Sequence, residues 1–379
     1  MHVPSAFAEG YEKAAAMDPA LAHLYANHLR IGDPDADAVT ADLAELPADE
    51  AQRLVRAGIE LDEDVLRQAP ESLQELIREA ATLPAWYDRE MAQRGCRAFL
   101  RNSDALLSAY IGGAMVEGFS TLLGKSYAAT GHAPDDGVRW LKQELRQLLD
   151  TFLPRGIEPS GDGWRATLRF RMANAQARRL LGASDRWQPD DWGVPISTAH
   201  VSLWAAARSA RLLEFLPLLG VDLESRDREG IMTVLSCAAH VMGVPGALLF
   251  DNPEEGLRLF RVAAASEPPP DADAVAMANR IVTSVPAAIG IDGTKARTNL
   301  ERYVYRISRE LIGDETADKL RFPQKQALSL LPWLRARGRI ARGLLRFSPG
   351  AAKARDREAF LYLLRISDPD EPEPPPREQ

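Results

Sequence analysis

The chain has 379 residues, of which 46% are hydrophobic and 26% are charged, and its formal net charge at pH 7 is −8. This composition is typical of a soluble globular protein with a substantial core, and the acidic balance argues against a general nucleic-acid-binding protein, which needs a basic face. Its two cysteines, Cys96 and Cys237, exclude a disulfide scaffold and a cysteine-based zinc or iron–sulfur site, and they fit a reducing cytoplasm.

The N-terminal residues show no targeting pattern. Residues 1–10 contain no basic segment followed by an apolar run, so we expect no signal peptide. No apolar run approaches the roughly 20 residues that a membrane-spanning helix needs. We therefore predict a cytoplasmic protein without a transmembrane segment.

Helical periodicity runs along almost the whole chain, and we find no convincing strand. Residues 6–30 predict one or two short helices, with Asp18-Pro19 as a start signal. Gly32-Asp33-Pro34-Asp35 predicts a turn that begins the next helix, and residues 35–82 hold three or four short helices. We interpret residues 1–82 as a helical layer packed on a core formed by residues 83–365.

The core begins with two predicted helices, at residues 84–100 and 103–130. The second is the most apolar segment of the chain, and we expect Ser103 to cap it and Gly131 to stop it. It contains four glycines, which lower helix propensity and permit the close approach of a neighbouring helix or of a flat ligand. We favour close helix packing as their role.

The remaining core is also predicted to be helical. Helices are expected over residues 136–153, 164–182, 225–243, 272–290, 297–312, 322–337 and 352–365. Another helix begins near Ser197 and places His200, Trp204 and Arg208 on one face. The acidic, proline-rich residues 366–379 predict a disordered tail. The predicted fold is therefore all-α, a single large helical bundle around a central, mostly apolar pocket.

A set of short motifs follows one another in a characteristic order between Leu83 and Pro286. They are LPAWYD at 83–88, RGCRAF at 94–99, RWL at 139–141, GDGW at 161–164, RFR at 169–171, GVPI at 193–196 and MGV at 242–244. In this order and spacing the sequence resembles the family of the MpaB-type oxygenases and the rubber oxygenases called latex clearing proteins. The resemblance implies a helical fold that encloses a b-type haem, and an oxidoreductase that acts on an apolar small molecule with molecular oxygen.

The sequence departs from the family pattern at three positions. The family has an Arg-Arg-Leu-x-x-Thr helix and, later, a His-Ala-x-x-Arg helix whose histidine is the axial haem ligand. Here Trp140 replaces the second arginine, Glu144 replaces the threonine and Asn174 replaces the histidine. Because haem iron is usually held by His, Cys, Met or Tyr, a carboxamide is a poor substitute. The haem site that the resemblance implies is therefore degenerate.

One interpretation keeps the cofactor. Haem b is then held by a displaced ligand such as His240 or His200, and Trp140, Arg171 and Asn174 belong to the same cofactor-binding site. The protein is then an oxygenase for an apolar small molecule, and a terpenoid, a polyketide and a fatty-acyl chain fit such a cavity equally well.

The other interpretation is a haem-less relative whose pocket binds a small molecule or performs cofactor-independent acid–base chemistry. Glu144 is then the titrating catalytic group, because a carboxyl that faces an apolar pocket must find a donor or its pKa rises. We expect it to pair with Arg171 or Arg178, and Arg178 is the second catalytic candidate. No spacing of histidines and carboxylates predicts a metal site. The sequence leaves open whether the chain is an enzyme, which reaction and substrate it has, and its oligomeric state.

Each candidate residue also has a purely structural interpretation. We favour Trp140 as a core residue over one that stacks on a ligand. Arg171 and Arg178 are equally suited to bonding helix ends or surface carboxylates. A lone histidine on a helix, such as His200 or His240, is more often a core or surface residue than a metal ligand.

Overall fold

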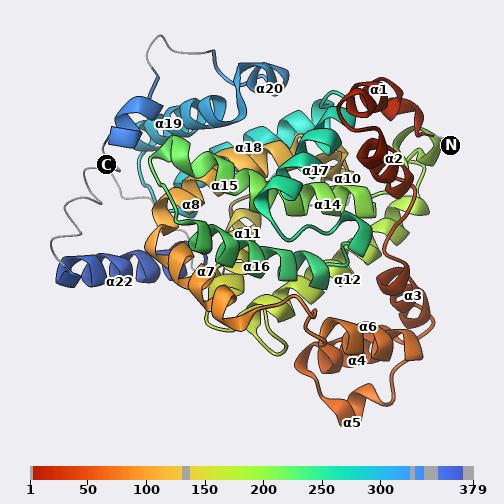
Figure 1. Cartoon of the computed structure of the whole chain (residues 1–379). Helices are drawn as coiled ribbons and strands as arrows, with labels where there is room; N and C mark the ends of the chain where they lie inside the picture. The colour runs from red at the N-terminus through yellow and green to blue at the C-terminus, as the bar shows by residue number, and fades with distance from the viewer. Residues whose placement is uncertain (1–2, 130–136, 325–328, 337–348, 370–379) are drawn as a thin grey trace.

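The computed structural model describes residues 3–129, 137–324, 329–336 and 349–369 (Figure 1). These residues form helices joined by short loops and contain no strand, which confirms the all-α prediction. The expected stop residue Gly131 and most of the expected tail lie outside the described residues. Among the described residues, no single helix is both long and apolar enough to cross a membrane; only the bent pair Ser103–Phe119 and Leu122–Ala129 meets that test jointly.

The N-terminal helices occupy two separate places. They are α1 (Ala8–Met17), α2 (Pro19–His28), α3 (Pro34–Leu43), α4 (Ala48–Glu60), α5 (Glu63–Leu66) and α6 (Glu71–Ala80). Helices α1 and α2 pack on α17 (Pro253–Ser266), whereas α3 to α6 form a group at one end of the molecule (Figure 1). That group has its own hydrophobic cluster, which also includes Trp164 and Leu168 of α12 (Asp162–Gly182).

Aspartates begin several of these helices, as the sequence predicts. Asp18 Oδ1 accepts a hydrogen bond from the Leu21 amide at the start of α2, and Asp33 Oδ1 accepts one from the Ala36 amide at the start of α3. In both helices proline occupies the first position, where its missing N–H is not needed. The N-terminal helix starts are therefore set by local sequence.

The central bundle is built around a long, tight helix contact. Its members are α7 (Arg89–Arg101), α11 (Gly137–Phe152), α12, α14 (Thr198–Ala206), α16 (Ser225–Val241), α17 and α18 (Ala272–Ala288), with the short helices α13 (Pro189–Trp192) and α15 (Leu212–Phe215). Helix α7 crosses α16 at Gly95 and Gly230, where a Cβ built on Gly95 would lie 2.1 Å from the Gly230 carbonyl oxygen. The two backbones therefore touch, and glycine is required on both helices at the crossing.

The expected single helix over residues 103–130 is wrong. The segment is divided into α8 (Ser103–Ala109), the π-helical turn η2 (Tyr110–Ala114), α9 (Met115–Phe119) and α10 (Leu122–Ala129). The chain bends by 84° at the break before Leu122. Asn102 precedes the first helical residue, Ser103, so Ser103 is not the cap.

The glycines of this segment serve close packing, as favoured from the sequence. A Cβ built on Gly118 would lie 2.4 Å from the Trp204 ring, and one built on Gly113 would lie 2.4 Å from the Phe215 ring. Any larger side chain at these positions therefore has to displace an aromatic ring.

The C-terminal helices complete the bundle on the side away from α3 to α6 (Figure 1). They are α19 (Thr294–Ile312), α20 (Asp314–Lys319) and α22 (Pro349–Ile366). The shorter helical turns are η1 (Ser5–Phe7), η4 (Ala207–Arg211), η5 (Leu216–Leu219) and η6 (Gly246–Leu248), of which η4 is π-helical. The predicted helix that opens at Pro84 begins instead at Arg89, because Asp88 is its N-cap.

Candidate functional site

Two π-helical turns contact each other near the middle of the bundle. They are η2, which begins at Tyr110, and η4, which contains Arg208. π-helical turns within α-helices are rare and occur frequently at functional sites. The side chains of Tyr110 and Arg208 both lie near Glu144 of α11, and these three residues form the polar centre of the candidate site.

Glu144 is 2% exposed, and its Oε2 accepts a hydrogen bond of 3.3 Å from the Tyr110 hydroxyl. Burial raises the pKa of its carboxyl to about 7, although the nearby Arg208 guanidinium and the Tyr110 hydrogen bond both act to lower it. A carboxyl with this pKa gains or loses a proton near neutral pH, which is the property required of a general acid or base.

Arg208 is buried without a hydrogen-bond acceptor. Its side chain is 6% exposed, and among the described contacts its Nε and Nη2 atoms have no partner. The guanidinium carbon lies 5.9 Å from the centre of the Trp204 ring, a distance at which a cation interacts with an aromatic face. Trp140 Nε1 is likewise buried without an acceptor. The cluster therefore contains more hydrogen-bond donors than acceptors.

Aromatic rings surround these polar groups. The Phe119 ring lies 5.0 Å from the rings of both Trp140 and Trp204, and 5.3 Å from the ring of Tyr127, measured between ring centres. Trp140 is therefore a core residue, as favoured from the sequence, and its indole N–H lies inside that core without a partner. We call Tyr110, Phe119, Tyr127, Trp140, Glu144, Trp204 and Arg208 the central cluster.

Asn174 lies on α12 at the edge of the central cluster. Its Oδ1 accepts a hydrogen bond of 3.2 Å from the Tyr127 hydroxyl, so the amide oxygen is already engaged. Burial raises the pKa values of Tyr110 and Tyr127 well above the ordinary phenol value, so both stay neutral phenols. Asn174 and the two tyrosines offer a carboxamide and neutral phenols, and these groups do not fit a haem iron.

The expected ion pair between Glu144 and an α12 arginine is wrong. Arg171 donates two hydrogen bonds to Asp33, and Arg178 donates one of 2.7 Å to Asp37 and one of 3.1 Å to the Ile196 carbonyl. Both arginines therefore join α12 to the first turn of α3. The two guanidinium groups pair with Asp33 and Asp37 because these carboxylates of α3 lie directly against α12.

His240 lies away from the central cluster. It is at the end of α16, half-buried, and the charged groups that act on it are Glu79 and Arg171. Burial lowers its pKa, which favours the neutral ring. It therefore lies where α12 meets the α3–α6 group. The structure does not bring it together with Glu144 or Asn174.

His200 belongs to a second buried polar group. Its Nδ1 lies 2.9 Å from Ser197 Oγ and its Nε2 lies 3.5 Å from Glu267 Oε1, which also accepts a hydrogen bond of 2.7 Å from the Tyr25 hydroxyl. Burial lowers the pKa of His200 to about 4 and raises that of Glu267 to about 7. Between these values both groups are mainly uncharged, so we treat the contact as a neutral pair rather than as an ion pair.

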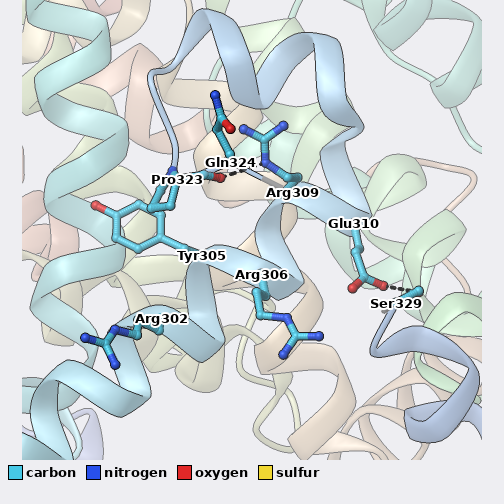
Figure 2. Close-up of a pocket in the computed structure, with 8 residues that line it drawn as sticks. All are labelled: Arg302, Tyr305, Arg306, Arg309, Glu310, Pro323, Gln324 and Ser329. Carbon is cyan, nitrogen blue, oxygen red and sulfur yellow. Dashed lines mark hydrogen bonds between the residues drawn. The ribbon is translucent and has the colours of Figure 1, made fainter. Parts of the chain in front are cut away.

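The hollows of the surface include a small one and a large one that lie outside the central cluster. Figure 2 shows the smaller, about 50 Å³, where Arg309 donates to the Pro323 carbonyl and Glu310 accepts from Ser329. These bonds tie α19 to the segment that follows it, which is a structural role. The larger, about 570 Å³, is a groove between α1, α17 and α20, and Glu267 lies in its wall. No group of three or more described His, Cys, Asp or Glu residues is arranged to hold a metal ion.

The sequence analysis singled out Glu144, Trp140 and Asn174 as candidates, but it did not predict the residues that contact them. Tyr110 and Tyr127 are separated from Glu144 in the chain and belong to a segment that reads as an apolar core helix. Arg208 could have been noticed in the sequence, because it is an arginine on the same face as His200 and Trp204 of an alanine-rich, largely buried helix. A charge at that place has to be solvated by the protein or by a ligand.

Comparisons with known proteins agree with this architecture. A family model described as "ER-bound oxygenase mpaB/B'/Rubber oxygenase, catalytic domain" matches residues 96–347, which is more than half of the chain. The rubber oxygenase of Streptomyces sp. (strain K30) is 25% identical over 231 residues, which cover 56% of this chain and 53% of that protein. The match thus spans about half the length of this curated relative.

A solved structure also matches. The structure of latex clearing protein in the closed state superposes with a TM-score of 0.68, at 18% sequence identity, and the match covers 89% of this chain and 91% of that one. At this identity the likeness shows a shared fold.

Proposed function

Because the chain belongs to the family of the MpaB-type and rubber oxygenases, we propose that it is a haem-independent member that binds a mostly apolar small molecule at the central cluster and moves a proton there with Glu144. The observation that carries the proposal is the Glu144 carboxyl, which lies between Tyr110 and Arg208 and whose pKa burial raises to about 7. Trp140, Glu144 and Asn174, which the sequence analysis identifies as departures from the family pattern, lie in or beside this cluster.

The residues of the cluster have separable roles in such a reaction. In its ionised form Glu144 accepts a proton from an acidic C–H or O–H group of the ligand, and in its protonated form it returns one. The Tyr110 hydroxyl stabilises the ionised form by donating to Oε2. The surrounding rings exclude water, which strengthens every electrostatic interaction inside. The reaction class is a proton transfer within the substrate, which needs no oxidant.

Absorption spectroscopy of the purified full-length protein, with and without added haemin and together with metal analysis, tests the absence of haem. We expect no Soret band in the purified protein and no band shift on adding haemin. A Soret band at one haem per chain would overturn the haem-independent assignment.

The titration of Glu144 tests the acid–base role. Trp140 and Trp204 belong to the same cluster, so we expect intrinsic fluorescence to change with pH with a midpoint near 7. Glu144→Gln should remove that transition. Glu267→Gln is the matched control, because Glu267 is a buried carboxyl with the same raised pKa outside the cluster, and it should leave the transition in place.

A second candidate is a haem-dependent oxygenase with a displaced ligand. It is favoured by His200, whose ring is kept neutral and whose buried Nε2 has no hydrogen-bond partner in the described structure. If a Soret band is found, His200→Ala should abolish it. Retention of the band in that variant would exclude His200 as the essential ligand.

A further inference from the structure

The charges of the central cluster do not balance. Arg208 is always protonated, because a guanidinium does not lose its proton in proteins. Its guanidinium lies near the Glu144 carboxyl, and near neutral pH that carboxyl is only partly ionised. Glu144 is also already bonded to Tyr110. The buried cluster therefore holds a surplus of positive charge.

The free hydrogen-bond donors point to the same conclusion. Arg208 of η4 has two buried nitrogens, Nε and Nη2, that find no acceptor among the described residues, and Trp140 Nε1 of α11 is a third such donor. Leaving a buried donor unsatisfied costs about 1–3 kcal/mol, and more when the group is charged. Native proteins rarely keep several such groups in one place unless another molecule supplies the acceptor.

The side chains around Arg208 indicate what kind of molecule would supply the acceptor. Arg208 lies over the Trp204 ring, and Trp204 and Trp140 both pack against Phe119. The polar donors are thus set among aromatic rings, which suits an apolar body with one polar end. A planar guanidinium binds a carboxylate with two parallel hydrogen bonds. A single arginine also matches the single negative charge of a carboxylate better than the larger charge of a phosphate.

We infer that Arg208 and Trp140 form the binding site for the carboxylate end of an otherwise apolar molecule, such as a long-chain carboxylic acid. This inference rests on the proposed function, because it places the ligand in the central cluster. It makes Arg208 the residue that selects acids over neutral molecules of the same length, with Trp140 Nε1 as the second donor.

The stability of the ligand-free protein gives the first test. Arg208→Met removes an unpartnered buried charge, so the variant should unfold at a higher temperature than the wild type. Arg171→Met is the matched control, since Arg171 is similarly buried but donates two hydrogen bonds to Asp33, and it should unfold at a lower temperature. If Arg208 serves only to stabilise the fold, both variants will be less stable than the wild type, and the inference is overturned.

Ligand binding gives the second test, with dodecanoic acid and 1-dodecanol as probes of equal chain length. Binding to the full-length protein is followed by tryptophan fluorescence. The acid should bind at least about tenfold more tightly than the alcohol, and Arg208→Met should remove that preference. Trp140→Phe should weaken acid binding by a smaller factor. Arg179→Met, at an exposed arginine of α12, should bind both probes like the wild type.

The outcomes separate the inference from the proposed function. Equal affinity for acid and alcohol, or an acid preference that survives Arg208→Met, overturns the inference and leaves the proposed apolar binding site standing. Failure of both probes to bind overturns the inference for this ligand class. The proposed function is then judged by the haemin spectrum and the Glu144 titration, neither of which uses a carboxylate probe.

Discussion

Arg171 and Asp33 form a buried ion pair that joins α12 to the start of α3. Arg171 Nε lies 2.6 Å from Asp33 Oδ2 and its Nη2 lies 2.9 Å from Asp33 Oδ1. The same Oδ1 accepts the hydrogen bond that caps α3. One aspartate thus begins a helix and anchors it, and Arg178 with Asp37 repeats the anchor further along both helices.

Asp33→Asn should lower the free energy of unfolding by about 3 kcal/mol, because it leaves Arg171 buried without its main carboxylate. The amide still caps α3, so the loss reports the ion pair rather than the cap. Asp35, which lies 3.4 Å from Arg171, keeps the loss at the lower end of the usual range. Urea unfolding of the variant measures it.

The double variant Asp33→Asn with Arg171→Met is the control for this prediction. It removes both charges and should recover part of the lost stability, since no buried guanidinium is then left uncompensated. Additive losses in the double variant would show that the two residues do not act as a pair.

Gly95→Ala should destabilise the protein by several kcal/mol, because the added Cβ would lie 2.1 Å from the Gly230 carbonyl oxygen and must push α7 and α16 apart. Thermal unfolding measures the loss. Gly182→Ala is the control: nothing lies within 4 Å of the added Cβ, and alanine favours the helix. Equal effects of the two substitutions would contradict the tight crossing.

Gly118→Ala should perturb the central cluster without breaking a backbone contact. The added Cβ would lie 2.4 Å from the Trp204 ring, so that ring must move. We expect a loss of about 1–3 kcal/mol, the usual cost of overpacking, together with a changed tryptophan fluorescence spectrum. Gly112→Ala meets only ordinary contacts of 3.5 Å or more and should leave the spectrum unaltered. An unchanged spectrum in Gly118→Ala would refute the packing described for Trp204.

The pH dependence of stability should report three buried groups. Glu144 and Glu267 have pKa values raised from 4.5 to about 7, so their contribution to stability is complete below pH 4.5 and is lost as the pH rises through 7. His200 has a pKa lowered from 6.5 to about 4, so its contribution is present above pH 6.5 and is lost as the pH falls towards 4. Between pH 4.5 and 6.5 a rise in pH therefore increases the contribution of His200 to stability while it decreases that of the two carboxyls.

Two variants separate these effects when the free energy of unfolding is measured from pH 4.5 to 8. Glu267→Gln should flatten the decline of stability towards pH 7. His200→Gln should steepen the decline between pH 4.5 and 6.5, because it removes the opposing group. Slopes identical to that of the wild type in both variants would show that these groups titrate normally in the folded protein.

Local sequence predicted the elements well and the long helix 103–130 badly. Asp18 and Asp33 cap the helices that the sequence predicts to begin there, and aspartate at a helix start is a strong local signal. Asp88 carries the same signal, although the helix was expected to open at Pro84. No proline marks the break after Phe119 in the sequence, and the apolar periodicity continues across the bend. Tertiary packing of Gly118 against Trp204 decides the path of the chain there, and a pattern read along one segment does not contain that partner.

The contacts of the candidate residues were predicted only in part for the same reason. Family motifs singled out Trp140, Glu144 and Asn174 as changed positions, and the structure places all three in or beside the central cluster. The partners of Glu144 come from distant segments, so the expected pairing with Arg171 or Arg178 failed. Several expectations stay predictions. They are a functional role for Arg178 and His240, the cytoplasmic location, and the division of the chain at residues 82 and 365.

The two π-helical turns determine the direction in which the later side chains of their helices point about the helix axis. Such a turn holds one residue more than the α-helical turn it replaces, so each acts as a single-residue insertion. Deleting one residue from Tyr110–Ala114 would restore an ordinary helix and turn all later side chains by about 100° about its axis. Phe119 would then leave its three aromatic neighbours, although no side chain had been altered. The central cluster thus depends on the length of these helices as much as on the identity of its residues.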